Sequence, residues 1–484
     1  MASPMRRPPG AGSPDPFFPD LRVRSLVFGI VLLALIAFGL TSVRARAQVA
    51  NVARHDSDFT CYTAAGAAAF AGRDPYAVTN PRGWHYLYPP LFAMLVAPLH
   101  NLHPELQAVA WFLINVALIF ACYFECARLV VYLKRSEEGP AHPRAFPGWL
   151  AFTPFLSIFL FGITCLELGQ VSILLLYLLL LGLRLVVAGR SWRAWALGGA
   201  AMAGAVALKL VPVLPAVVLL VGLVLAPHTP EGDPAQSGRA VSANAGFAAG
   251  VLAFFFLLPG LLVGWDANIG YLHRFVDAVV TNPDLGRDAH INVTGPGNQS
   301  WRYAARNLGN WLVSGGKIVP RVVEIPAPET GTPLDSPGAR LASRAFVAML
   351  LVALAGALWR LVRGGSAHGL ALAYALACTA TVVLPPISWS HMFVLQLLAA
   401  LLAPWWVWLC GCPRLALVVA AIPLALELQH YLLRASLRLV GVLGVGTALW
   451  LIAVCIVMVF LPGRARARDD AGAPLAPPPA QGVP

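Results

Sequence analysis

Charged residues are scarce in this sequence of 484 residues. Asp, Glu, Lys and Arg together make up 12% of it, whereas soluble domains carry about 25%. Hydrophobic residues make up 58%, and the mean hydropathy is +0.71. A soluble chain of this length could not bury so much apolar surface, but a lipid bilayer removes the need to do so. The scarcity of charge therefore excludes an ordinary soluble domain and predicts an integral membrane protein.

Lysine is rarer still. The net charge of +12 comes from 31 Arg and only three Lys, which are Lys134, Lys209 and Lys317. With the abundance of Ala, Gly and Pro, this skew indicates GC-rich coding and favours a bacterial source. The basic residues also cluster at the ends of hydrophobic segments, as orientation signals do. We therefore expect no nucleic-acid partner.

Patterns that would bind a metal ion are also lacking. Most of the eight cysteines lie inside apolar runs, where they are small hydrophobic residues, as at Cys122, Cys126, Cys165, Cys378 and Cys455. Cys410 and Cys412 alone are weak evidence for a metal site. The acidic residues are not clustered as a cage for a divalent ion requires. We expect no metal and no cofactor.

Long apolar segments are what the sequence has in abundance. About twelve are long enough, or nearly so, to span roughly 30 Å of hydrocarbon. They predict an all-α, polytopic transmembrane bundle. The least secure are the fifth, which is short, and the sixth, which only Lys209 separates from it. The segments are 22–40, 106–130, 148–166, 171–189, 195–208, 210–226, 244–264, 345–363, 367–386, 391–410, 414–432 and 438–461.

The regions outside these segments divide the chain. Residues 1–20 and 463–484 are rich in Pro, Ala and Gly and are predicted to be disordered cytoplasmic ends. The membrane domain is predicted to span 21–462. Its first segment lacks a small-residue cleavage site and is interpreted as an anchor.

Basic residues predict the orientation of the chain. With the N-terminus in the cytosol, Lys and Arg concentrate on the cytosolic side, and the short turns 167–170 and 387–390 on the other side have none. Two long loops, 41–105 and 265–344, are then external. We expect the first to contain short interfacial helices.

Unusual polar residues fall on that external side. Charged groups near the hydrocarbon are costly and mark functional sites by default. An acid, a cation, amides and an imidazole from distant parts of the chain therefore predict one site at this membrane face. They are Asp56, Asp58, Glu167, Gln170, Lys209, Asn298, Gln299, Trp389 and His391.

Six stretches of sequence, in this order, resemble glycosyltransferase family 87. They read SDFTCYTAAGAAAFAGRDPY, YLYPPLFAMLVAPL, LGQVSILLL, ALKLVPVLPAVVLL, GNQSWRYAAR and SWSHMF. Each is weak by itself, but their order and common side make the combination specific. The resemblance implies the C-superfamily fold and a mannosyltransferase-like enzyme. Its donor would be a polyprenyl-phosphate sugar, and its acceptor a lipid or glycan on the extracytoplasmic face of a bacterial inner membrane.

The resemblance also implies roles for individual residues. Asp58, in a pattern that ends at Tyr62, corresponds to the catalytic acid of the family's first loop. His391 corresponds to the histidine of the late Ser-Trp-x-His pattern, and Met392 stands where members often have a second histidine. Lys209, His391 and Gln170 would bind the donor and its phosphate. The pocket would be lined by Asp56, Tyr62, Asn298, Gln299 and Trp389.

The chemistry of such a transfer fits a single acid. A base must take the proton of the acceptor hydroxyl as its oxygen attacks C1 of the sugar, and a base contributes about 10²–10⁴-fold. The leaving phosphate is already stable as an anion, so a second carboxyl group is not needed, in contrast to glycoside hydrolysis. Direct displacement inverts the anomeric centre. Cations and hydrogen bonds at the leaving phosphate supply much of the rest.

Each residue also has a structural interpretation. Asp58 could be a helix N-cap, although catalysis is favoured. Lys209 could extend its ammonium to the interface, and Gln170 could serve helix packing. Asp56 and His55 stay open between loop and acceptor site, and Glu167 is unassigned.

Two other interpretations concern a wider region. Tyr86 and Tyr88, beside two prolines, are interpreted as architectural residues of an interfacial belt.

The alternative function for the whole protein is that of a transporter or lipid flippase of envelope glycan assembly, without catalytic activity.

Overall fold

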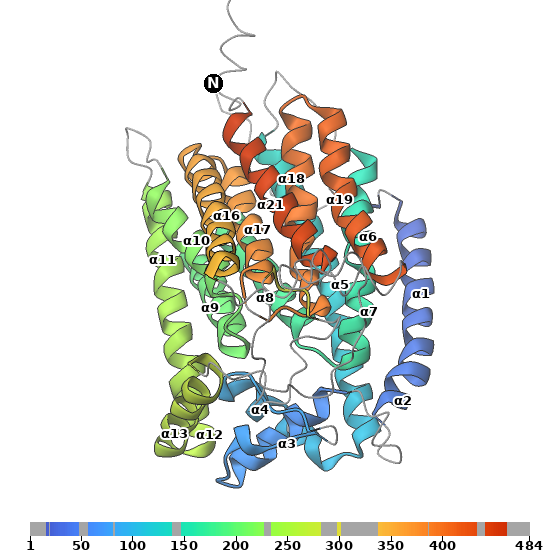
Figure 1. Cartoon of the computed structure of the whole chain (residues 1–484), viewed down its shortest axis with the longest axis vertical. Helices are drawn as coiled ribbons and strands as arrows, with labels where there is room; N and C mark the ends of the chain where they lie inside the picture. Colours follow the sequence, from blue (N-terminus) through green and yellow to red (C-terminus); the bar gives the residue numbers. More distant parts are fainter. Residues whose placement is uncertain are drawn as a thin grey trace, which may run out of the picture.

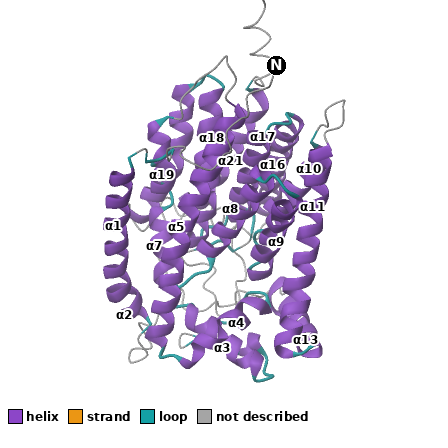
Figure 2. Ribbon diagram, turned by 180° about the vertical axis from the view of Figure 1, so that it is seen from behind, coloured by secondary structure: helices purple, strands orange, loops and turns teal. Residues whose placement is uncertain are grey.

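The computed structural model describes ten stretches of the chain: 16–18, 20–47, 57–80, 83–137, 147–226, 234–281, 298–301, 337–385, 387–432 and 441–461. Within them the fold is all-helical, as predicted, and the only extended pairings are isolated bridges between Thr79 and His85 and between Asn298 and Trp389. Figures 1 and 2 show long helices side by side, with several short helices gathered at one end of the bundle.

Seven helices in the described stretches are long and apolar enough to cross a membrane. They begin with α1 (Leu21–Phe38), which continues through the π-helix η1 (Gly39–Val43) and α2 (Arg44–Arg46). The others are α5 (Pro104–Glu137), α11 (Pro234–Val251) with η6 (Leu252–Leu257) and α12 (Leu258–Val263), α16 (Pro337–Arg363), η9 (Ser390–Gln396) with α18 (Leu397–Leu409), α19 (Pro413–Leu432) and α21 (Val442–Phe460).

The remaining predicted spans are shorter helices. α8 (Ser172–Ala188), α9 (Trp192–Leu208) and α17 (Ala367–Val383) each have 17 residues. Their length of about 26 Å, at 1.5 Å per residue, is slightly less than the hydrocarbon thickness. α10 (Val213–Leu225) is shorter again. The count of twelve spans therefore stays a prediction.

The segment 148–166 is not the single span that the sequence predicted. It contains the 3₁₀-helix η5 (Gly148–Ala151), the one-turn helix α6 (Thr153–Leu156) and then α7 (Phe159–Leu168). The helical hydrogen bonds stop between α6 and α7, although the apolar composition continues. Hydropathy reports the run of apolar residues and is insensitive to this interruption.

The core of the bundle surrounds α17 and α18. From His368 to Val383 every residue of α17 is buried, because small and apolar residues cover all sides of the helix. η9 and α18 are also largely buried, whereas most of α1 is exposed. α1 therefore forms part of the outer, lipid-facing layer.

Short helices close the lower end of the bundle in Figure 1, as predicted for the first loop. They are α3 (Phe59–Phe70), η3 (Pro75–Ala77), α4 (Pro90–Val96) and η4 (Ala97–Asn101), with α13 (Trp265–Phe275) beside them. α3 and α4 touch at Gly66, where an added Cβ would lie 2.1 Å from the Ala93 carbonyl oxygen. The Tyr271 hydroxyl of α13 donates to the Ala69 carbonyl of α3 at 3.0 Å.

Candidate functional site

Asp58 lies at the start of α3, next to the end of α7. Its backbone N–H donates to the Leu168 carbonyl at 2.9 Å. Asp58 occupies the N-cap position of α3, but its side chain makes no capping hydrogen bond to that helix. The carboxylate instead accepts a hydrogen bond from the side-chain amide of Gln170. Donation by an amide to a carboxylate favours the ionised form.

A tight turn after α7 places Gln170. Gly169 has φ of +69°, a left-handed conformation that glycine adopts without strain, and an added Cβ would lie 2.8 Å from Phe59 Cβ. The Gln170 N–H donates to the Cys165 carbonyl at 2.9 Å, and Trp111 Nε1 donates to the Gln170 carbonyl at 3.3 Å. The backbone on both sides of the amide is therefore fixed.

Two tyrosines contact the other end of the Gln170 side chain. The hydroxyl groups of Tyr88 and Tyr62 donate to Gln170 Oε1 at 3.1 Å and 3.4 Å, and they lie 3.1 Å from each other. Both side chains are buried, and burial raises the pKa of Tyr62 and of Tyr88. Both are therefore neutral hydrogen-bonding groups at ordinary pH.

Lys209 completes this group from the connection between α9 and α10, outside both helices. Its backbone is extended, with φ of −161° and ψ of 134°. Its Nζ donates to the Tyr88 hydroxyl at 3.4 Å and lies 4.7 Å from the centre of the Tyr88 ring. Burial lowers the pKa of Lys209 to about 8, against the opposing effect of the Asp58 charge. The ammonium is directed at other site residues and not at the interface.

We call Asp58, Tyr62, Tyr88, Gln170 and Lys209 the central cluster. An unbroken chain of hydrogen bonds runs from the Asp58 carboxylate through the Gln170 amide and the Tyr88 hydroxyl to the Lys209 ammonium. It joins four separate segments of the sequence. The arrangement places a proton acceptor and a cation at the two ends of one polar group.

His391 lies next to the central cluster. It is buried in η9, its carbonyl oxygen is the acceptor for Cys165 Sγ at 3.1 Å, and its Nε2 has no hydrogen-bond partner among the described residues. The charge of Lys209 also acts on the imidazole. Cys165 thus accepts a hydrogen bond from Gln170 with its carbonyl oxygen and donates one to His391 with its thiol.

The other predicted pocket residues form a packed support beside His391. The Asn298 side-chain oxygen accepts the N–H groups of Ser300 and Ser388 at 3.1 Å and 3.0 Å, and the Gln299 N–H donates to the Ser388 carbonyl at 2.6 Å. Asn298 also pairs with Trp389 in the isolated bridge. The Asn298 side-chain oxygen therefore binds the backbone N–H groups of two serines. Pocket roles for Asn298, Gln299 and Trp389 stay predictions.

Three further residues of the sequence prediction have no contact with the central cluster to report. Asp56 and His55 lie outside the described residues. The Glu167 carboxylate forms an ion pair with Arg46 at 3.2 Å, which ties the start of the turn to the end of α2. Among the described residues, no three His, Cys, Asp or Glu side chains gather in a way that would hold a metal ion.

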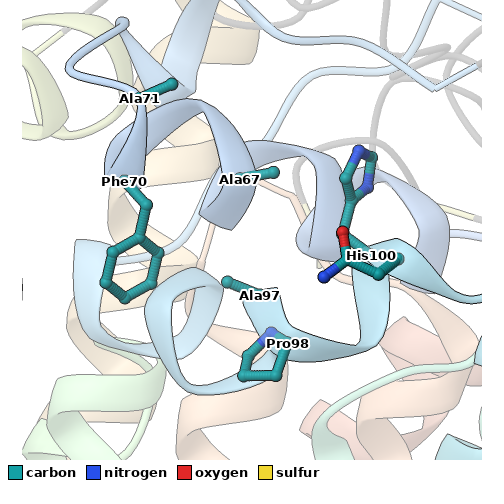
Figure 3. Close-up of a pocket in the computed structure, with 7 residues that line it drawn as sticks. Ala67, Phe70, Ala71, Ala97, Pro98 and His100 are labelled. Atoms are coloured by element: carbon teal, nitrogen blue, oxygen red, sulfur yellow. The ribbon is translucent and has the colours of Figure 1, made fainter.

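A separate groove of about 430 Å³ lies between α3 and η4. Figure 3 shows Phe70 and Ala67 on one side of it, and Ala97, Pro98 and His100 on the other. The residues of α3 that line it belong to the last turns of the helix. Asp58 lies at the opposite end of α3 and does not line the groove. The groove is therefore distinct from the central cluster.

Tyr88 is the member of the central cluster that the sequence did not assign. Its architectural interpretation was incomplete, because its hydroxyl contacts both Gln170 and Lys209. Its neighbour Tyr86 is architectural as predicted, since its hydroxyl donates to the Pro89 carbonyl at 2.6 Å and accepts the Ala93 N–H. The signal that could have identified Tyr88 was its place in one of the six family-like stretches.

The fold and the central cluster define a class: a polytopic membrane protein with a polar site where its short helices meet the bundle. Comparison with known families gives the particular assignment. The sequence model of glycosyltransferase family 87 matches residues 86–386, and the chain belongs to this family. The protein is therefore a membrane glycosyltransferase. Comparisons with curated proteins and with solved structures gave no match.

The matched region contains part of the site. Tyr88, Gln170 and Lys209 lie inside it, whereas Asp58 and His391 lie outside. The family match and the contacts of Asp58 are thus independent observations.

Proposed function

We propose that this glycosyltransferase moves a hexose, and specifically mannose, from a polyprenyl-phosphate sugar to a hydroxyl group of a lipid or glycan acceptor. The observation that carries the proposal is the hydrogen-bonded chain from Asp58 to Lys209. A transfer from a lipid phosphate needs a base for the acceptor hydroxyl and a cation for the leaving phosphate. The two ends of the chain supply one of each.

In the proposed step, the acceptor oxygen attacks C1 of the sugar while its proton passes to the Asp58 carboxylate. The bond between C1 and the phosphate oxygen breaks, and its electron pair stays on the released polyprenyl phosphate. Displacement from the opposite side inverts the anomeric centre, so a β-linked donor gives an α-linked product.

The other site residues support this step. The Gln170 amide holds the carboxylate in place and favours its ionised form. Lys209 would contact the phosphate as a point charge, and the Nε2 of His391, next to it, would donate a further hydrogen bond. The apolar surroundings strengthen these interactions, since charges interact more strongly in a medium of low dielectric constant.

The proposed membrane side follows from charge. In Figure 1, α1 runs downward from its first residue to α2, and α3 and α4 lie at the lower end of the bundle. Arg22 and Arg24 begin α1, and Arg360 and Arg363 end α16. The bias of Lys and Arg toward the cytosol supports the proposal that the central cluster lies at the extracytoplasmic face. The GC-rich composition supports a bacterial inner membrane as the location. The family assignment disfavours a transporter or flippase without catalytic activity.

The donor can be tested with the purified protein in proteoliposomes. It would be offered radiolabelled polyprenyl-phospho-mannose, polyprenyl-phospho-glucose, a polyprenyl-phospho-pentose and the matching nucleotide sugars, together with a membrane lipid extract as acceptor. We expect transfer from the lipid-linked mannose with inversion. Transfer from a nucleotide sugar, or retention of configuration, would contradict the proposal.

A further inference from the structure

The interruption between α6 and α7 leaves backbone groups without helical partners in an otherwise apolar segment. α6 ends at Leu156 and α7 begins at Phe159. The first N–H groups and the last carbonyl groups of a helix have no partners within it. Where water is absent, each unpaired group is costly, so an irregular backbone at membrane depth is tolerated only where the protein satisfies it.

Two buried polar side chains from other helices fill this interruption. Glu427 of α19 accepts the N–H groups of Leu160 and Phe161 at 2.7 Å and 3.4 Å. Gln396, the last residue of η9, donates to the Ser157 carbonyl at 3.3 Å. Glu427 and Gln396 are each only 1% exposed. A carboxylate at a helix N-terminus is also stabilised by the helix dipole.

Both elements that meet at the interruption carry site residues. α7 ends at Leu168, whose carbonyl binds the Asp58 N–H at 2.9 Å, and Gln170 follows two residues later. η9 contains His391 and ends at Gln396. The helix that begins at the interruption therefore leads into the turn that carries the amide beside Asp58.

A second contact also joins α7 to α19. The Thr164 hydroxyl lies 2.5 Å from the Tyr431 hydroxyl, one turn beyond Glu427 in α19. Glu427 and Tyr431 thus hold one side of α7 at two levels.

We infer that Glu427 is a positioning residue of the transfer reaction: by capping α7 from α19, it fixes the turn that presents Gln170 to Asp58. It touches no reacting atom. The expected effect on kcat rests on the proposed function. The capping of α7 rests only on the hydrogen bonds that Glu427 accepts from Leu160 and Phe161.

The test compares Glu427→Leu with Glu427→Gln in the full chain. The control is Asp266→Asn, at an exposed position of α13. Leucine removes the acceptor, whereas the glutamine oxygen can still accept the two N–H groups. Two quantities are measured: hydrogen exchange of the peptide covering 157–168, and kcat and KM for the lipid-linked sugar. Displacing a catalytic group by about 1 Å costs on the order of 100-fold.

We expect Glu427→Leu to exchange faster at 157–168 and to lose about 100-fold in kcat, with KM for the donor nearly unchanged. Glu427→Gln should restore the protection and most of kcat, and Asp266→Asn should match the wild type. Glu427→Leu with wild-type exchange, or with lost protection and wild-type kcat, would overturn the inference.

A second variant covers the case in which Glu427→Leu does not fold. Gln396→Met keeps the shape of the side chain but leaves the Ser157 carbonyl unpaired, and it should show the same direction of change in exchange and kcat. Wild-type values for both would count against the positioning role. If the wild type transferred no lipid-linked sugar while the exchange results held, the proposed function would fail and the capping of α7 by Glu427 would stand.

Discussion

Lys209 gives the sharpest quantitative prediction. Lys209→Met removes the ammonium but keeps an unbranched side chain that can still lie over the Tyr88 ring. If Lys209 binds the donor phosphate, the variant loses a charge-assisted interaction in a half-buried site, while the chain from Asp58 to Tyr88 stays intact. We therefore expect a lower kcat/KM for the donor in a folded protein.

The size of the loss can be bounded. A unit charge about 4 Å from a phosphate charge contributes roughly 4 kcal/mol at an effective dielectric constant near 20. A hydrogen bond to a charged group has a net worth of about 1.5–3 kcal/mol. Because the net worth of a hydrogen bond already includes the loss of hydration of both groups, we take the lower range. It corresponds to a fall of roughly 10- to 100-fold, since about 1.4 kcal/mol is tenfold.

The pH dependence provides a second signature. The pKa of Lys209 is about 8, so its side chain is charged below this pH and becomes neutral as the pH rises through it. The wild-type kcat/KM should therefore fall above about pH 8. Lys209→Arg, which stays charged, should move this decline to higher pH.

The assay is the rate of sugar transfer against donor concentration from pH 6 to 10, with Lys134→Met in α5 as the control. Lys134 is an exposed lysine near the end of α5, so its loss should leave kcat/KM unchanged. A Lys209→Met variant with wild-type kcat/KM, or a Lys209→Arg variant with an unshifted profile, would refute the phosphate role.

Two further substitutions test the site, and a third tests an ion pair between α5 and α8. Gly169→Ala forces a left-handed conformation that costs about 1–2 kcal/mol and pushes a Cβ into Phe59, so both Tm and kcat should fall; unchanged kcat would show that the turn does not place Gln170. Tyr88→Phe removes the hydroxyl between Gln170 and Lys209; it should lower kcat/KM about fivefold, for a net loss near 1 kcal/mol, and an unchanged rate would remove Tyr88 from the site. Glu125→Gln leaves Arg184 and the exposed Arg128 without an opposite charge beside a buried carboxylate, which costs about 1.5–3 kcal/mol of stability; thermal unfolding in detergent should show a lower Tm, and an unchanged Tm would contradict the pairing.

Apolar composition predicted the positions of the helices well. Each of the twelve predicted segments contains helix, because a long apolar run at membrane depth must satisfy its own backbone. The interruption in 148–166 was not predictable in this way. It depends on Glu427 and Gln396, which lie more than 200 residues away in sequence and are recognisable as caps only when the helices have packed.

The site was predictable where residue chemistry was unusual for its surroundings. Asp58, Gln170 and Lys209 were chosen as polar groups beside apolar runs, and the structure joins them through one chain of contacts. Tyr88 was interpreted by composition as an interfacial aromatic, since nothing in the sequence shows where a tyrosine hydroxyl points. Glu167 looked equally unusual, but its charge is used in the ion pair with Arg46.

The most direct test of the central claim is sugar transfer by Asp58→Asn. The asparagine oxygen can still accept the Gln170 hydrogen bond, so the packing of the site is kept while the base is removed. We predict that the folded variant binds the lipid-linked sugar but transfers it at least 100-fold more slowly, as loss of a general base requires. An Asp58→Asn protein that transfers sugar at the wild-type rate would contradict the account.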